Sequence, residues 1–101
     1  MKALNVLFAT AALTLTASFA QADVRPDEIP ALLSSNAIMP FEKLNKIATD
    51  LHPGATIRDT ELDHHYGNYV YEVELTGANN IKWEVELDAK TGAVKKNHQD
   101  N

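Results

Sequence analysis

Hydrophobic and polar residues alternate strictly in two stretches of the chain, residues 71–75 and 83–87. The second stretch repeats the first twelve residues later, with the same Glu-Val-Glu-Leu ending. A period of two is typical of a half-buried β-strand, so the aromatic residue, valine and leucine of each copy share one face. Both glutamates of each copy share the other face. Joined through residues 77–80, the two copies predict an antiparallel hairpin with an apolar side and an acidic side.

Residues 40–51 carry the longer period of an amphipathic helix. Pro53 and the glycine after it predict the end of this helix, because proline cannot continue it. On the polar side of the helix, Glu42 and Lys46 have the spacing of a weak ion pair. The hydrophobic stripe of this helix consists of Phe41, Leu44, Ile47, Ala48 and Leu51.

Beyond the helix, residues 55–63 predict a first strand. Ile57 and Leu62 have opposite parity along it, and a regular strand cannot bury both. We therefore expect either a β-bulge between them or one of the two outside the core.

Two further turns and a last strand complete the pattern. Residues 66–68 predict the turn before the hairpin, and residues 88–92 predict a turn in which aspartate bonds back to the backbone and glycine takes a positive φ. A short last strand then ends the core at Val94, and residues 97–101 form a polar tail.

The register of the hairpin is predicted from charge. One register pairs Leu75 with Trp83 and sets two pairs of glutamates opposite each other. A shift by two residues, so that Leu75 meets Ile81, sets Glu74 opposite Lys82 and leaves one Glu–Glu pair. Cross-strand pairs contribute roughly 0.2–1 kcal/mol each, so the second register is favoured.

The hydrophobic stripe of the helix and the apolar side of the hairpin would each be exposed to water unless they pack against each other. The pattern therefore predicts a two-layer α+β domain over residues 40–96, with one main helix packed on a three- to four-stranded antiparallel β-meander, the helix coming before the strands. Residues 23–39 predict a lead-in segment with a short helical turn. Cysteine is absent, so no disulfide supports this small core.

Residues 1–22 predict a signal peptide, with Lys2, an apolar run and small residues that allow cleavage after Ala20 or Ala22. A membrane span needs about 20 apolar residues and stop-transfer charges, which are missing here. We therefore expect a periplasmic or secreted protein with no membrane attachment after cleavage.

The composition is acidic, with nine Lys and Arg residues against fourteen Asp and Glu residues and a net charge of −5. Removing Lys2 with the leader makes this −6. Such a domain has no electrostatic reason to bind nucleic acid or an anionic membrane. Ser34 and Ser35 have no glycine elbow around them, and no phosphate-binding loop is present. We expect neither an enzyme nor a cofactor, and no metal site.

Carboxylates gather on the solvent side of the predicted hairpin, and those of the first strand join them if Leu62 points inward. They offer docking for a basic partner or loose binding of a cation. The simplest interpretation is a solvated face kept charged against aggregation, because Ca²⁺ needs six to eight converging oxygens. The carboxylates are Glu72, Glu74, Glu84 and Glu86, with Asp59, Glu61 and Asp63 from the first strand.

The second candidate surface is the corner formed by His64, His65, Tyr66 and Tyr69. The two histidines are adjacent, so on a strand they point to opposite faces and cannot share one metal. His65 with nearby carboxylates gives only part of a zinc site, but these carboxylates favour its protonated form and suggest a pH-sensitive contact. Tyr71 and Trp83 are expected in the core instead.

Three segments of the chain resemble a PepSY domain. They are residues 52–57, His-Pro-Gly-Ala-Thr-Ile, residues 71–75, and residues 83–94, in which an Asp-Ala-Lys-Thr-Gly turn is followed by valine two residues later. The similarity extends over about residues 40–96. It implies an exported protein with a helix-on-sheet fold and no catalytic residues of its own.

Domains of this kind occur in the propeptides of thermolysin-type metallopeptidases, where they are implicated in restraining the enzyme. The resemblance therefore implies a module that binds or inhibits an extracytoplasmic peptidase in trans, since no protease domain follows here. Two alternatives stay open. One is a sensor or carrier of a small cation or of pH, using the acidic face with His64 and His65. The other is a homodimer that buries a sheet edge.

Overall fold

The structure, a computed structural model, describes residues 21–100. The predicted signal peptide lies outside these residues except for its last two positions. No helix among residues 21–100 is long and apolar enough to cross a membrane. The elements in chain order are β1 (Gln21–Asp23), η1 (Pro26–Glu28), α2 (Ile29–Ser34), α3 (Phe41–Leu51), β2 (Thr56–His65), β3 (Asn68–Thr76), η2 (Ala78–Asn80), β4 (Lys82–Asp88) and β5 (Val94–Gln99).

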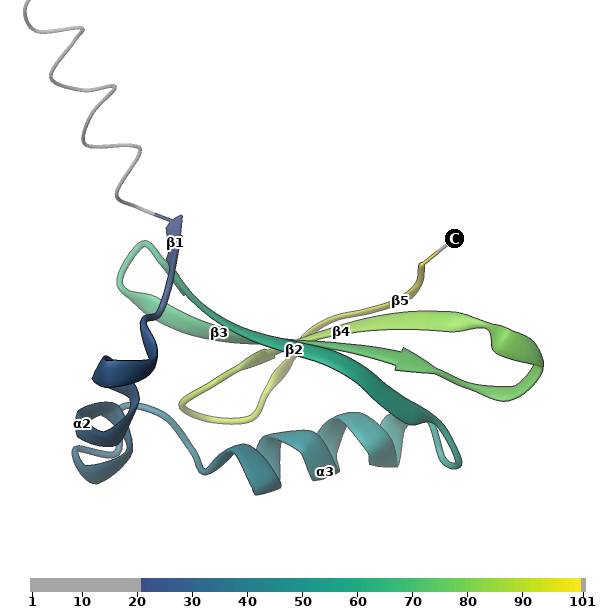
Figure 1. The fold of residues 1–101 in the computed structure, drawn as a ribbon, viewed down its shortest axis with the longest axis horizontal. Helices are drawn as coiled ribbons and strands as arrows, with labels where there is room; N and C mark the ends of the chain where they lie inside the picture. Colours follow the sequence, from purple (N-terminus) through teal and green to yellow (C-terminus); the bar gives the residue numbers. More distant parts are fainter. Residues whose placement is uncertain (1–20, 101) are drawn as a thin grey trace, which may run out of the picture.

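The strands form one antiparallel sheet in the order β1-β2-β3-β4-β5. Helix α3 lies across one face of this twisted sheet, and no described helix covers the other face (Figure 1). The predicted α+β class, with a helix on an antiparallel meander, is confirmed. The short helical turn expected in the lead-in is also present, as η1 and α2.

Strand β1 was not predicted. Its three residues carry no periodic pattern, and they become a strand only because they pair with the end of β2, from Gln21 opposite His65 to Asp23 opposite Asp63. Two of these residues fall inside the segment assigned to the signal peptide. Local periodicity therefore could not predict this edge of the sheet, because the edge forms by pairing between residues that are distant in the sequence.

The core lies between α3 and the inner face of the sheet, as the patterns predicted. Leu44 of α3 and Val73 of β3 are both fully buried. Tyr71 is 3% exposed, stacks on Phe41 with ring centroids 5.2 Å apart, and donates a hydrogen bond of 2.8 Å from its hydroxyl to Asn45 Oδ1. The tyrosine therefore fills the core with its ring and satisfies its hydroxyl on the helix.

A β-bulge in β2 resolves the conflict of parity. The register shifts between Ile57 and Asp59, which leaves Arg58 as the extra residue. Ile57 then lies opposite Leu75 and Leu62 opposite Tyr71, so both side chains face the helix. The bulge is the first of the two outcomes expected from the sequence.

The favoured hairpin register is wrong. Leu75 lies opposite Trp83, Glu74 opposite Glu84, and Glu72 opposite Glu86. This is the register with two Glu–Glu pairs that the charge argument rejected.

Two features of the structure favour this register. The loop is longer than a tight turn, with Asn79 and Asn80 at φ values of 60° and 59°, and it closes through a 2.8 Å hydrogen bond from the Gly77 N–H to the Ile81 carbonyl. In addition, β5 brings Lys96 close to the glutamates of β4. The predicted register considered only the charges of the two hairpin strands, so it did not include Lys96.

The C-terminal part of the chain also differs from the prediction. Strand β5 continues to Gln99, so residues 97–99 belong to the sheet and not to a tail. Val94 is 47% exposed and does not end the core. Ala89 does so instead, because it is fully buried and its carbonyl accepts a 2.7 Å hydrogen bond from the Met39 N–H.

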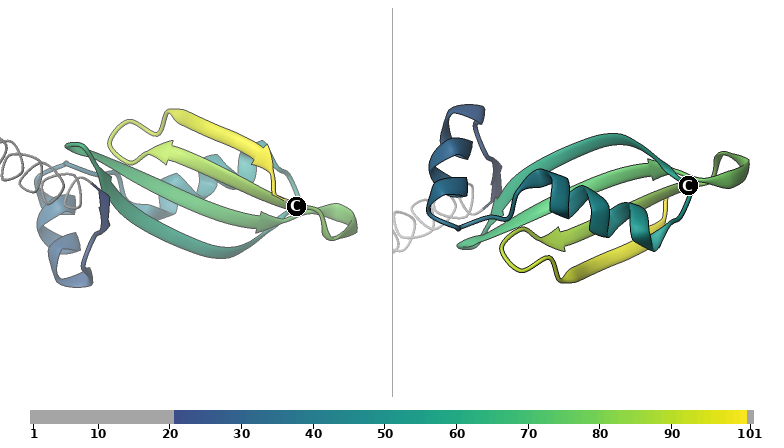
Figure 2. Two further views of the ribbon diagram at one scale, coloured as in Figure 1. Left: turned by 90° about the horizontal axis from the view of Figure 1, so that it is seen from above. Right: turned by 90° about the horizontal axis from the view of Figure 1, so that it is seen from below.

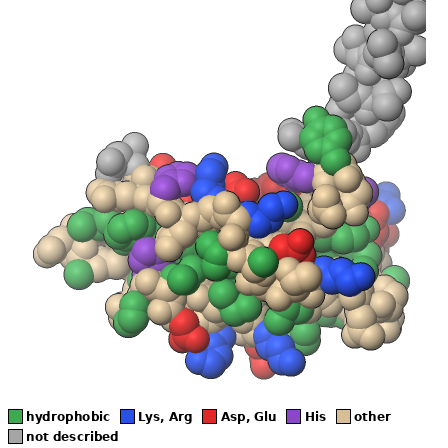
Figure 3. Space-filling view, turned by 180° about the vertical axis from the view of Figure 1, so that it is seen from behind, with side chains coloured by type: hydrophobic (Ala, Val, Ile, Leu, Met, Phe, Trp, Pro, Cys, Tyr) green, Lys and Arg blue, Asp and Glu red, His purple; other side chains and the backbone are tan. Residues whose placement is uncertain are grey.

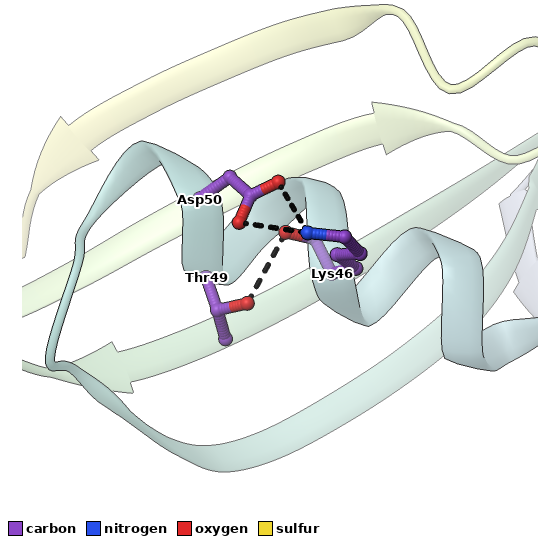
Figure 4. A network of polar contacts seen from close by, with 3 residues as sticks. All are labelled: Lys46, Thr49 and Asp50. Atoms are coloured by element: carbon purple, nitrogen blue, oxygen red, sulfur yellow. Dashed lines mark hydrogen bonds and ion pairs between the residues drawn. The ribbon is translucent and has the colours of Figure 1, made fainter.

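On the exposed side of α3, the predicted pair between Glu42 and Lys46 is wrong. Lys46 Nζ lies 3.1 Å from Asp50 Oδ2, and Thr49 Oγ1 donates a 3.1 Å hydrogen bond to the Lys46 carbonyl (Figure 4). Lys46 has an acidic residue four positions away on each side, so the spacing alone did not select between them.

Candidate functional site

The face of the sheet opposite α3 is acidic. Strands β2, β3 and β4 set their outward carboxylates side by side in two rows across the sheet. One row runs through Glu61, Glu72 and Glu86, and the next runs through Asp59, Glu74 and Glu84. All of the carboxylates predicted for this face therefore lie on it, and Asp63 continues it toward β1.

Strand β5 brings a lysine and a histidine to one end of these rows. Lys96 Nζ lies 3.6 Å from carboxylate oxygens of both Glu84 and Glu86, and His98 Nε2 lies 3.3 Å from Glu84. Figure 3 looks onto the β5 side and shows lysine or arginine and histidine side chains among the carboxylates there. His98, predicted to lie in a tail, is thus part of the charged surface.

The β2 end of the rows has no such compensation. Among residues 21–100, no lysine, arginine or histidine forms an ion pair with Asp59, Glu61 or Asp63. Arg25 follows β1 in the chain, but it forms ion pairs with other residues: its Nε lies 3.4 Å from Asp27 Oδ1 and 3.8 Å from Glu28 Oε1. Ion pairs therefore offset part of the negative charge at the β5 end of the acidic face, and no described ion pair does so at the β2 end.

Glu72 lies in the middle of the face, and its pKa is raised from 4.5 to about 7. Partial burial is the main cause, because it disfavours the charged form. Repulsion adds to it from Glu84 and Glu86 on β4, from Glu61 on β2 and from Glu74 on its own strand.

A second group of carboxylates lies where β1 meets β2. The pKa of Glu61 is raised to about 7, first because it shares hydrogen bonds with Asp23 and Asp63, and then because of the charge of Asp63. Burial raises the pKa of Asp63 as well, and its Oδ1 is buried without a hydrogen-bond partner. These three carboxylates therefore lie close together where β1 pairs with β2.

The carboxylates form two close triads, Asp23–Glu61–Asp63 and Glu72–Glu84–Glu86, in each of which one oxygen per residue lies within 4.8 Å of the others. Three such oxygens are fewer than the six to eight that Ca²⁺ takes. Neither triad includes His65, which the sequence had grouped with Glu61 and Asp63. The arrangement is best suited to sharing protons or attracting basic groups.

The predicted histidine–tyrosine corner is only partly assembled. His64 stacks on Tyr69, with ring centroids 4.7 Å apart, on the helix side of the sheet. His65 lies opposite Asn68 and points to the acidic face. Tyr66 occupies the turn with φ 48° and is 72% exposed. The four side chains do not form one contact surface, because the strand alternation separates them.

Sequence reasoning missed the contacts of His52, which it assigned only to the end of the helix. The imidazole stacks on Trp83 at 4.3 Å, and its Nε2 lies 2.7 Å from Asn97 Oδ1. It therefore ties the end of α3 to β4 and β5. The partner Asn97 was in the presumed tail, so no sequence signal could have found the contact.

One hollow among the described residues lies at the edge of the acidic face, beside Glu74 and away from the histidine–tyrosine corner. It has a volume of about 440 Å³ and is lined in part by Arg58, Glu74 and Lys82. Ser34 and Ser35, the only candidates for a nucleophile considered above, donate their hydroxyl hydrogen bonds to carbonyls within three or four residues. No base or carboxylate in residues 21–100 activates them.

One main helix on an antiparallel sheet places the described residues in the class of small two-layer α+β domains. Residues 38–98 match the family model described as PepSY, the peptidase propeptide and YPEB domain. The match covers more than half of the chain, and the chain belongs to this family. PepSY domains are generally non-catalytic modules and are typically extracytoplasmic. No curated protein and no solved structure matches the chain.

Proposed function

We propose that this protein is an exported, non-enzymatic binding module that meets an extracytoplasmic peptidase in trans and restrains it. The observation that carries the proposal is the acidic face of the sheet, which no described helix covers. Membership in the PepSY family and the leader-like residues 1–22 support a periplasmic or secreted location. Restraint would come from steric occlusion or from strand addition at an open edge of the sheet.

An inhibition assay tests this function. We expect the purified protein to inhibit a secreted thermolysin-type peptidase of its own source stoichiometrically, and immobilised protein to retain that peptidase from the native extract. The Glu42→Gln variant, which changes an exposed carboxylate on the helix layer, serves as the control and should inhibit equally. An unchanged peptidase activity together with no retained protein would refute the proposal.

A second candidate function is that of a sensor, either of pH or of a small cation. The raised pKa values of Glu61 and Glu72 favour a pH sensor over a cation sensor. A cation held at a hundred times its Kd would stabilise the fold by about 2.7 kcal/mol. Since each triad offers few oxygens, we expect no shift of Tm with Ca²⁺, Mg²⁺, Mn²⁺ or Zn²⁺. A rise of about 10 °C with any of them would restore the cation hypothesis.

A further inference from the structure

Strand β1 covers only one end of β2. Their pairing begins at His65 and reaches Asp63, and the Val24 N–H then donates a 3.0 Å hydrogen bond to the Leu62 carbonyl. From Thr56 to Glu61, no described strand lies on the side of β2 away from β3. Figure 2 shows this stretch of β2 as the free border of the sheet beside α3.

The backbone groups that face this border can be identified. In an antiparallel strand, the N–H and C=O of one residue point to the same side, and successive residues alternate. The Leu62 carbonyl points toward β1, so the N–H and C=O of Thr60 point to the same border. Thr60 is exposed, and no described strand pairs with its border side. These groups form a template for one more strand.

The side chains at this border give it a charge. Asp59 and Glu61 are exposed, lie on the acidic face and pair with no cation among the described residues. Because the pKa of Glu61 is about 7, its negative charge is fully present only above that pH. Arg58 in the bulge limits the acidic stretch at its N-terminal end. The opposite border, β5, carries lysines instead, and Lys96 is already engaged with Glu84 and Glu86.

We propose that the open border of β2 at residues 56–61 receives an extended, basic segment of the partner protein as an added strand. The segment runs antiparallel to β2, in line with β1, and its alternate lysine or arginine side chains lie against Asp59 and Glu61. Backbone hydrogen bonds to Thr60 supply affinity, and the carboxylates select a basic sequence. This inference rests on the proposed function, for which it names the surface and the chemistry of the partner.

The same charges argue against a second copy of this chain at the border. Two β2 borders side by side would set carboxylates against carboxylates, which is unfavourable. Joining the β2 border of one copy to the β5 border of the next has complementary charge, but it is a head-to-tail contact that need not close into a ring. A basic segment of another protein meets neither obstacle.

The test uses the exported protein and a ten-residue peptide of alternating lysine and valine, blocked at both ends. We expect binding with amide chemical-shift changes centred on Thr60, within residues 56–61. Two control peptides separate the contributions: one keeps the charges but carries N-methyl groups on alternate backbone nitrogens, and one replaces lysine by glutamate. Each should bind at least about tenfold more weakly, which corresponds to 1.4 kcal/mol.

Variants of the protein complete the test. Thr60→Pro removes the border N–H while leaving the pairing with β3, since proline is tolerated on edge strands where the N–H faces solvent. It should weaken binding about tenfold or more. Should this variant not fold, the double change Asp59→Lys and Glu61→Lys should have the same effect, and Glu42→Lys on α3 should have none.

Three results would overturn the inference: equal binding of the N-methylated peptide, shift changes centred on β5, or light scattering that shows self-association abolished by Thr60→Pro. The proposed function is judged separately. If Thr60→Pro restrains the peptidase as well as the native chain does, the border inference fails and the function stands. If the peptide binds as expected and no peptidase is restrained, the function fails and the border remains a binding site.

Discussion

Replacing Leu44 by alanine is expected to lower the free energy of unfolding by about 3 kcal/mol. Leu44 is fully buried in the layer between α3 and the sheet, and removing a buried leucine costs about 2–5 kcal/mol in transfer and cavity terms. A domain of this size is only marginally stable. In a chain this short, each kcal/mol lowers Tm by about 4–8 °C, so the Tm should fall by about 10–25 °C in a thermal melt.

Leu51→Ala is the matched control, because it makes the same change on the same helix at a side chain that is 37% exposed. It should lower the free energy of unfolding by less than about 1 kcal/mol, since part of the side chain is already in water. Equal losses in the two variants would contradict the placement of the core beneath α3.

The elements that the sequence predicted well are those whose information is local. The stripe around Leu44 and the alternation around Val73 and Val85 each fix which face is buried, and burial then brings the layers together. The bulge at Arg58 was foreseeable for the same reason, because two apolar residues of opposite parity both needed the core. The acidic face followed automatically from the inward residues.

The features that were missed depend on pairing between distant residues. The hairpin register was misjudged because Lys96, which approaches Glu84 and Glu86, belongs to a strand taken for a tail. The strand β1 exists only through β2, and with it the contact of Asp23 with Glu61. In each case the sequence contained the residues but no periodic signal for their neighbours.

The protonation of the acidic face links this site to stability. The folded-state pKa of Glu72, about 7, lies above its ordinary value of 4.5, so the folded state binds the proton more tightly than the unfolded state. The contribution of Glu72 to stability is therefore fully present below about pH 4.5, is lost as the pH rises to about 7, and changes little above that. The charged groups around Glu72 are Glu61, Glu74, Glu84 and Glu86, with Lys96 bound to the last two.

Glu72→Gln is consequently expected to stabilise the protein at pH 8 by about 1–2 kcal/mol, a value discounted for screening by solvent, and to change little at pH 4.5. Glutamine resembles the protonated acid in shape and removes the charge that burial and the neighbouring glutamates oppose. Urea unfolding at the two pH values measures the difference, with Glu42→Gln on the exposed side of α3 as the control. Equal stabilisation at both pH values would show that the charge of Glu72 costs the fold nothing, and the acidic face would then have no part in a response to pH.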